Sequence, residues 1–393
     1  MLFIVDRMYS WLSEDKLKYK MYKNSYSKSL FGLLLIASLT SSLFLSGCGK
    51  PGNEASHDGD SHSEAHVAEI PCVIVSTTDL MGIVEAVAGH LVKLHCFGKG
   101  NQDPHDLDIL PSYVREMNDA DLWIQVGNDI EAAWYPDLMA NVTNPNIIKG
   151  ADGFLDTSVS IMNLEGAVGN VSGVGHSSGL HPSGNPHYLL DPIEGIRAAK
   201  LIAEQLSKIM PAQKDQLQQN YENFRTGLAE ALIGAELAEH HDVIEIADLY
   251  LEDKLKDFLG KQSHGIKLGG WLGELADHRG TAIVGDHDLW PYFSRRVGLS
   301  VVGYFEPEPG VPPTTKHLQI LISQMKAESV RIIFSAPYFD DKHGRFVSEN
   351  TGAQVLPMCH QTKARPNTDS YFDMVRHNME TLIKALNKEK PNK

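Results

Sequence analysis

The chain has 393 residues, 42% of them hydrophobic, which is enough for two domains of ordinary size with a core each. It carries 35 Lys and Arg against 50 Asp and Glu, a formal net charge of −15 at pH 7. This composition excludes a mainly disordered chain, and the acidic balance argues against nucleic acid as a partner, because nucleic-acid binding needs a basic face.

Residues 1–48 have the pattern of an export signal. A lysine-rich segment precedes an apolar run at 29–46, an order typical of secretory signals. The run is short for a membrane span, which takes about 20 residues, and it ends in Leu-Ser-Gly before Cys48. Small residues before a cysteine resemble the lipobox of bacterial lipoproteins. We expect a lipoprotein signal peptide that ends at lipidated Cys48, the alternative being an uncleaved membrane anchor. The start stays open between Met1 and Met21.

Residues 49–70 are predicted to be a polar tether. They contain several histidines, and two interpretations remain open: a solvated linker, or a tail that collects metal with low affinity. These histidines are His57, His62 and His66. Three cysteines remain besides Cys48, an odd set that does not indicate a disulfide framework.

From residue 71 the pattern alternates between strands and helices. β-Branched and apolar runs predict strands at 72–77, 92–97 and 121–127, and helical spacing predicts helices at 80–89 and 111–120. This alternation is typical of a parallel sheet with crossover helices. We assign an N-terminal lobe to 71–190, with a mobile loop rich in Gly, Ser and Asn at 150–185.

A long helical segment at 191–239 is predicted to link this lobe to a second one. Residues 240–270 are interpreted as an insertion, and 271–393 as a C-terminal lobe. In that lobe we predict strands at 281–286, 299–305, 330–336 and 353–358, and helices at 289–298, 316–328 and 370–386. The expected fold is α/β with two lobes, each a mostly parallel sheet with flanking helices, joined by one long helix.

Three of the 18 histidines lie where ligands of such sheets collect. His105 and His287 each follow a predicted strand, and His187 stands at the end of the Gly-rich loop, just before the long helix. Ligands of open α/β sheets bind at the carboxyl ends of strands. Any one of these residues could be a surface histidine, but their equivalent placement predicts one shared site.

Imidazole is a common metal ligand that suits zinc, whereas carboxylate-rich sites suit manganese better. Pro104 and Pro186 each precede a histidine and restrict the backbone before metal arrives. The predicted metal ligands are His105, His187 and His287, and the predicted metal is zinc.

Four segments carry a distinctive pattern: DPHDLDILPSYVREMNDADLWIQVG at 103–127, NPHYLLDP at 185–192, HDLWPYFSRRVGLSVVGYFEPEPGVPPTTKHL at 287–318 and DSYFDMVRHNMETL at 369–382. In this order they resemble the substrate-binding subunits of zinc and manganese ABC transporters, the cluster A-I receptors. The resemblance covers roughly residues 71–390. It implies that the three histidines bind a transported metal ion and that the linking helix is rigid. It also implies delivery to a permease and an ATPase by an envelope protein, expected to be monomeric.

The chain departs from this family pattern at the fourth ligand. Many members have an Asp about twelve residues before the tyrosine of the closing helix, where this chain has Cys359 with His360 beside it. Thiolate and imidazole both bind zinc, so Cys359, His360 and water all remain open. Glu306 lies in a family loop and is interpreted as structural. His176 and His181 are interpreted either as metal-capturing residues or as part of a plain loop.

Other functions remain as alternatives. A manganese or iron receptor would use the same fold, and a surface adhesin is a third possibility among binding proteins. A zinc hydrolase is disfavoured because the sequence has no H-E-x-x-H motif. We therefore predict a protein that is not an enzyme and has no catalytic residue. Since the sequence also has no Walker A pattern, permease and ATPase are expected to be separate chains.

Overall fold

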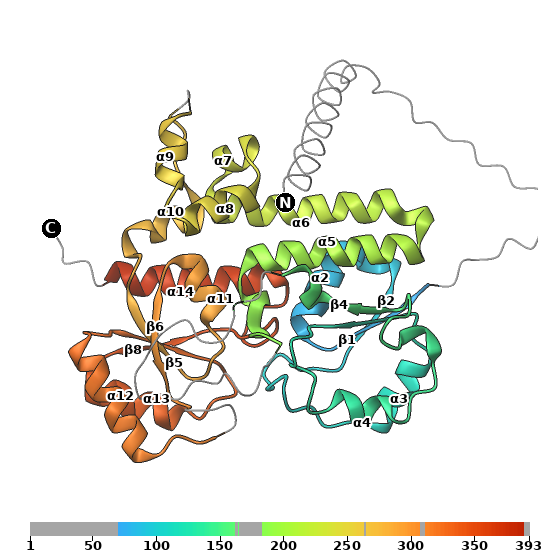
Figure 1. Cartoon of the computed structure of the whole chain (residues 1–393), viewed down its shortest axis with the longest axis horizontal. Helices are drawn as coiled ribbons and strands as arrows, with labels where there is room; N and C mark the ends of the chain where they lie inside the picture. The colour runs from blue at the N-terminus through green and yellow to red at the C-terminus, as the bar shows by residue number, and fades with distance from the viewer. Residues whose placement is uncertain (1–69, 162–163, 165–182, 263–264, 307–310, 389–393) are drawn as a thin grey trace, which may run out of the picture. The chain divides into compact units, whose positions relative to one another are not determined.

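The computed structural model describes residues 70–161, 164, 183–262, 265–306 and 311–388, all within one compact unit, Val67–Lys393. Two four-stranded sheets dominate this part of the chain (Figure 1). No helix among the described residues is both long and apolar enough to cross a bilayer. The predicted signal, Cys48 and most of the tether lie outside the described residues, and so do the loop histidines His176 and His181.

The first sheet has the strand order β2-β1-β3-β4, and all its neighbouring strands are parallel. Its core strand β1 is fully buried from Val73 to Val75. The structure adds a strand and a 3-10 helix inside the segment that we interpreted as a loop at 150–185. The elements of this lobe are β1 (Cys72–Val75), α2 (Thr78–Ala88), β2 (Lys93–Cys96), α3 (Pro111–Asn118), β3 (Leu122–Gln125), α4 (Tyr135–Met139), β4 (Phe154–Asp156) and η4 (Thr157–Ser160).

The second sheet repeats this arrangement, with the order β6-β5-β7-β8 and parallel pairing throughout. The strand that comes first in each lobe thus lies inside its sheet, and the carboxyl ends of all strands in one sheet share one edge. The expected α/β fold of two mostly parallel sheets is confirmed. Its elements are β5 (Ala282–Gly285), α11 (Pro291–Val297), β6 (Ser300–Tyr304), α12 (Thr315–Ala327), β7 (Ile332–Ser335), α13 (Asp341–Thr351), β8 (Gln354–Pro357) and α14 (Tyr371–Lys388).

Two helices form the link, α5 (Pro192–Ile209) and α6 (Lys214–Ile233), and they lie side by side in Figure 1. The predicted helical segment is therefore a helical pair with a break at Pro211, because proline cannot supply the backbone N–H that a continuous helix needs. One hydrophobic cluster runs from the first sheet through both helices into the second sheet. This shared core packs both helices against the two sheets.

The predicted insertion at 240–270 is mostly helical. Its helix α8 packs beside α6 and contacts α11 of the second lobe. Arg296 on α11 donates from Nε to both carboxylate oxygens of Asp191 at 2.9 Å, and from Nη1 to the carbonyl of Ala247 on α8 at 2.9 Å. One buried guanidinium thus ties the start of α5, the insertion and the second lobe together. The insertion contains α8 (Val243–Leu251) and α9 (Leu255–Gly260), and α7 (Ala235–His240) and α10 (Gly270–Leu275) border it.

Candidate metal centre

The three histidines predicted to bind metal lie together. The ring centroids of His105 and His187 are 5.1 Å apart, and His287 lies 6.1 Å and 6.0 Å from them. His105 comes from the loop after β2, His187 opens the 3-10 helix η5 (His187–Leu190), and His287 comes from the turn after β5. Two sheet edges and the start of the link therefore meet at this cluster, as expected for loops at the carboxyl ends of parallel strands.

The spacing of the rings can be compared with that around a bound ion. Zn–N distances of about 2.0–2.1 Å in a tetrahedral site would put the centroids of rings about 5 Å apart. The His105–His187 pair has this separation, whereas His287 stands about one ångström farther out. In the part of the chain that the structure describes, no three His, Cys, Asp or Glu side chains are already in closed metal-ligand geometry. Binding would therefore require a small inward movement of His287.

Asp103 orients the ring of His105. Its Oδ1 lies 2.8 Å from His105 Nδ1 and also accepts from the backbone N–H of His105 at 3.0 Å. Burial alone would raise the pKa of Asp103, but its hydrogen bonds to His105 and its electrostatic interactions with His105 and His287 outweigh burial and lower it. An ionised Asp103 favours the tautomer with its proton on Nδ1 and the lone pair on Nε2, as a carboxylate beside a metal-binding histidine commonly does.

A buried carboxylate fixes the turn that carries His287. Asp286 is fully buried and its Oδ1 accepts from the backbone N–H of His287 at 2.9 Å and from Trp290 Nε1 at 3.0 Å. Burial raises the pKa of Asp286 to about 6. On the ring itself, Nδ1 lies 3.5 Å from Glu306 Oε2. The sequence interpretation of Glu306 as merely structural is therefore incomplete, because this carboxylate lies beside the ring of a candidate ligand.

Asn185 connects the loop of His187 to the turn of His287. Its Oδ1 accepts from the backbone N–H of His187 at 3.0 Å, and its Nδ2 donates to the carbonyl of Asp288 at 2.9 Å. Asp288 in turn accepts from the hydroxyl of Tyr304 on β6 at 2.7 Å. The two histidines thus belong to one hydrogen-bonded set of loops, which holds them within a short distance of each other.

His360, one of the open candidates for a fourth ligand, lines a small cavity with His187. The cavity measures about 20 Å³, room for one water-sized occupant. His360 is 5% exposed, and burial lowers its pKa to about 4, so the ring is neutral at physiological pH. A neutral ring is the form that binds metal.

The hydrogen bonds around His360 indicate its tautomer. Gln361 Nε2 has two hydrogens, and the carbonyls of Lys99 and Gln102 lie 3.1 Å and 2.9 Å away to accept them. His360 Nε2 then donates to the Gln102 carbonyl at 3.0 Å. The alternative, with Nε2 accepting from Gln361 at 3.0 Å, would bury the Nδ1–H without an acceptor, at a cost of about 1–3 kcal/mol. We infer that Nδ1 carries a buried lone pair without a partner among the described residues.

Cys359 has a different environment from its neighbour. It is fully buried in the hydrophobic core, and its backbone N–H and carbonyl bond the side chain of Asn378 on α14 at 2.7 Å and 2.8 Å. Burial raises the pKa of its thiol to about 12, which opposes the thiolate form that zinc needs. It does not line the cavity beside His187. Of the two open candidates, the geometry favours His360.

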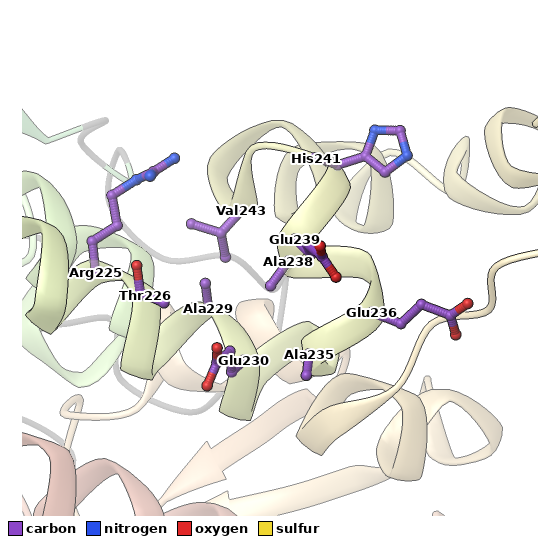
Figure 2. Close-up of a pocket in the computed structure, with 10 residues that line it drawn as sticks. All are labelled: Arg225, Thr226, Ala229, Glu230, Ala235, Glu236, Ala238, Glu239, His241 and Val243. Carbon is purple, nitrogen blue, oxygen red and sulfur yellow. The ribbon is translucent and has the colours of Figure 1, made fainter. Parts of the chain in front are cut away.

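A larger hollow of about 430 Å³ lies among α6, α7 and α8 (Figure 2). Small side chains such as Ala229 and Ala238 line it together with Glu230 and Glu239. None of the histidines considered as metal ligands lines this hollow. It is thus separate from the histidine cluster.

Two α/β lobes, a helical link and a histidine cluster where their loops meet define a two-lobed binding protein. The chain matches the family model described as zinc-uptake complex component A, periplasmic, over residues 73–239 and 269–385. It belongs to this family, whose members are substrate-binding components of metal transporters and not enzymes. The match passes over residues 240–268, which contain α8 and α9.

Curated relatives are named as lipoproteins of metal ABC transporters. A metal ABC transporter substrate-binding lipoprotein of Lactococcus lactis subsp. lactis is 25% identical over 323 residues, 80% of this chain and 88% of the relative. The manganese ABC transporter substrate-binding lipoprotein PsaA of Streptococcus mitis is 24% identical over 324 residues, 80% and 89% of the two chains. The relatives therefore support a metal as cargo without deciding which metal.

A solved structure has the same fold. The laminin binding protein Lmb of Streptococcus agalactiae, described as bifunctional with adhesin and metal transporting activity, superposes with a TM-score of 0.57 at 18% identity. The match covers 80% of this chain and 99% of that chain. At this identity the likeness establishes the fold alone.

Proposed function

We propose that this protein captures one zinc ion with His105, His187 and His287 and delivers it to an ABC importer. The observation that carries the proposal is the convergence of three imidazole rings from three separate loops, within 5.1–6.1 Å of one another. Asp103 hydrogen-bonds one of these rings and Glu306 lies beside another, as carboxylates that orient metal-binding histidines do.

His360 is proposed as the fourth ligand, through Nδ1. Its buried lone pair has no other partner among the described residues, and it lines a cavity with His187. Four neutral imidazoles would close a tetrahedral shell without an open position for substrate water, which suits a carrier better than a hydrolase.

Zinc is preferred over manganese because the proposed donors are all nitrogen atoms. Manganese is the second candidate, since relatives are named for it and Glu306 lies close enough to His287 to offer an oxygen donor after a small movement. A manganese-specific site would require Glu306 to bind the ion directly.

The proposal includes export and lipid anchoring at Cys48, with separate permease and ATPase chains as partners. Its support is the lipobox-like sequence and the lipoprotein names of the relatives. Labelled palmitate should enter the wild-type protein and not the Cys48→Ser variant when expressed in a bacterium. Equal labelling of both would contradict anchoring at this residue.

Calorimetric titration of the purified, metal-stripped protein tests the site. Zinc should bind at one tight site, and manganese more weakly. Loss of a residue that only hydrogen-bonds a metal ligand typically lowers affinity about 10–100-fold, and His187→Ala should lower zinc affinity by more than this. His240→Ala, at an exposed position on α7, should leave zinc affinity unchanged. His360→Ala should lower zinc affinity, whereas Cys359→Ala should leave it unchanged. Unchanged affinity in His187→Ala would refute the site.

A further inference from the structure

The segment that follows β8 leaves its own lobe and bonds the first one. Thr362 donates from its backbone N–H to Asp79 Oδ1 at 2.8 Å, and from its hydroxyl to the same oxygen at 3.1 Å. Thr78 Oγ1 donates to the Thr362 carbonyl at 2.6 Å. Asp79 is 6% and Thr362 0% exposed, and burial raises the pKa of Asp79 to about 7 despite both bonds from Thr362. These contacts join the two lobes through buried hydrogen bonds.

Gln361 adds a second set of bonds beside the first. Its Nε2 donates to the carbonyls of Lys99 and Gln102, as described above. Its Oε1 lies 3.0 Å from Thr78 Oγ1. Both ends of this amide therefore contact the first lobe, where residues 99–102 lead directly into the loop of His105. We call the four residues Thr78, Asp79, Gln361 and Thr362 the interlobe latch.

The two backbones at the latch are in direct contact. A Cβ on Gly100 would lie 2.3 Å from the carbonyl carbon of Lys363 and 2.6 Å from the Thr362 carbonyl oxygen. Only glycine fits this close approach without moving one of the loops. The loop before His105 and the loop that carries His360 are therefore held as one packed unit.

We propose that Asp79 and Thr362 are positioning residues for the metal site, acting through His360. The inference rests on the proposed function, since it takes His360 to be a ligand. His360 stands two residues before Thr362 on a short irregular segment, so without the latch its ring would have to be ordered when metal arrives. Fixing a ligand in advance removes this ordering cost from binding.

This role differs from a general contribution to stability. The latch holds the backbone on one side of His360, while the Gln102 carbonyl sets the ring through Nε2. Neither Asp79 nor Thr362 is itself proposed to touch the metal. Loss of the latch should therefore lower metal affinity by no more than loss of His360 itself does.

The test compares latch variants with a matched control by zinc calorimetry and by the absorption spectrum of the Co²⁺ form. Asp79→Ala removes both bonds to Thr362, Thr362→Val removes one at nearly constant size, and Asp79→Asn keeps an oxygen acceptor. Asp242→Ala is the control, because Asp242, like Asp79, accepts two hydrogen bonds through Oδ1 but lies in the insertion. We expect Asp79→Ala to lower zinc affinity about 10–100-fold, with Thr362→Val intermediate and Asp79→Asn near wild type. Asp242→Ala should bind zinc as wild type does.

A double variant separates positioning from stability. In the His360→Ala background, Asp79→Ala should cause no further loss of zinc affinity, and the Co²⁺ spectra of both single variants should move in the same direction. Additive losses, or wild-type affinity in both Asp79→Ala and Thr362→Val, would overturn the inference while leaving the metal site in place. A wild-type protein that binds neither zinc nor Co²⁺ would instead overturn the proposed function. Should Asp79→Ala fail to fold, the milder Thr362→Val carries the same comparison.

Discussion

The buried ion pair between Asp191 and Arg296 should be worth several kcal/mol of stability. Arg296 is 2% exposed and Asp191 4%, and the carboxylate also caps α5 by accepting from the N–H of Ile193 at 2.9 Å. Asp191→Asn keeps the size and the capping oxygen, since Asn is as good a cap as Asp. It removes the charge and one of the two oxygens that accept from Arg296 Nε, which leaves the Arg296 guanidinium buried without its carboxylate partner.

Removing one partner of such a pair typically costs about 3–5 kcal/mol, and we expect Asp191→Asn to lower the free energy of unfolding by this amount. Replacing both partners, in Asp191→Asn with Arg296→Met, should cost less than Asp191→Asn alone, because no unpaired charge remains. Urea unfolding followed by circular dichroism measures these differences, and the core shared by both lobes predicts one transition.

Asp340→Asn is the matched control. Asp340 likewise caps a helix and pairs with a lysine, Lys342, but this pair is solvent-exposed. Its replacement should leave stability unchanged, since exposed pairs contribute little. Two results would refute the assignment of a desolvated pair. One is a loss under about 1 kcal/mol in Asp191→Asn. The other is a loss in the double variant as large as the losses in Asp191→Asn and in Arg296→Met added together.

The other predictions concern pH and backbone packing. Burial raises the pKa of Asp79 and of Glu131 to about 7, above their unfolded values, so the metal-free protein should lose stability as pH rises from about 4 through 7. Asp79→Asn should make the unfolding free energy, measured with urea at a series of pH values, fall less steeply with pH. An unchanged slope would contradict the raised pKa of Asp79. Gly100→Ala should destabilise by about 1–3 kcal/mol through overpacking, whereas Gly227→Ala on α6, which has open space around it, should stabilise by about 0.5–1 kcal/mol. Equal changes in melting temperature for Gly100→Ala and Gly227→Ala would show that the contact at Gly100 is not tight.

Local patterns in the sequence carry much of the fold. The runs at β1, β5 and β7 are apolar and rich in Val and Ile, since strands buried on both faces need such residues. The break between α5 and α6 also has a local signal, Pro211. The prediction of one helix over 191–239 does not take this proline into account. The strand β4 has only three residues, and so short a strand gives no periodicity to detect.

Partners that are distant in the sequence could not be predicted in the same way. Asp79 and Thr362 are 283 positions apart, and neither lies in a motif that points to the other. The contact between Asp103 and His105 is local in the sequence, since Asp103 stands two residues before the histidine. Glu306 comes close to His287 because β5 and β6 are neighbours that end at the same sheet edge.

The sequence by itself determined the two α/β lobes and three histidines at loop positions, because strand and helix periodicity and strand-end placement are local properties. The tertiary structure alone distinguished Cys359 from His360. Although they are neighbours in the sequence, Cys359 packs in the hydrophobic core and His360 lines the cavity. Which one entered the core depended on the packing of α14 against Cys359 and on the carbonyl of Gln102 in the other lobe, and no local pattern records either contact.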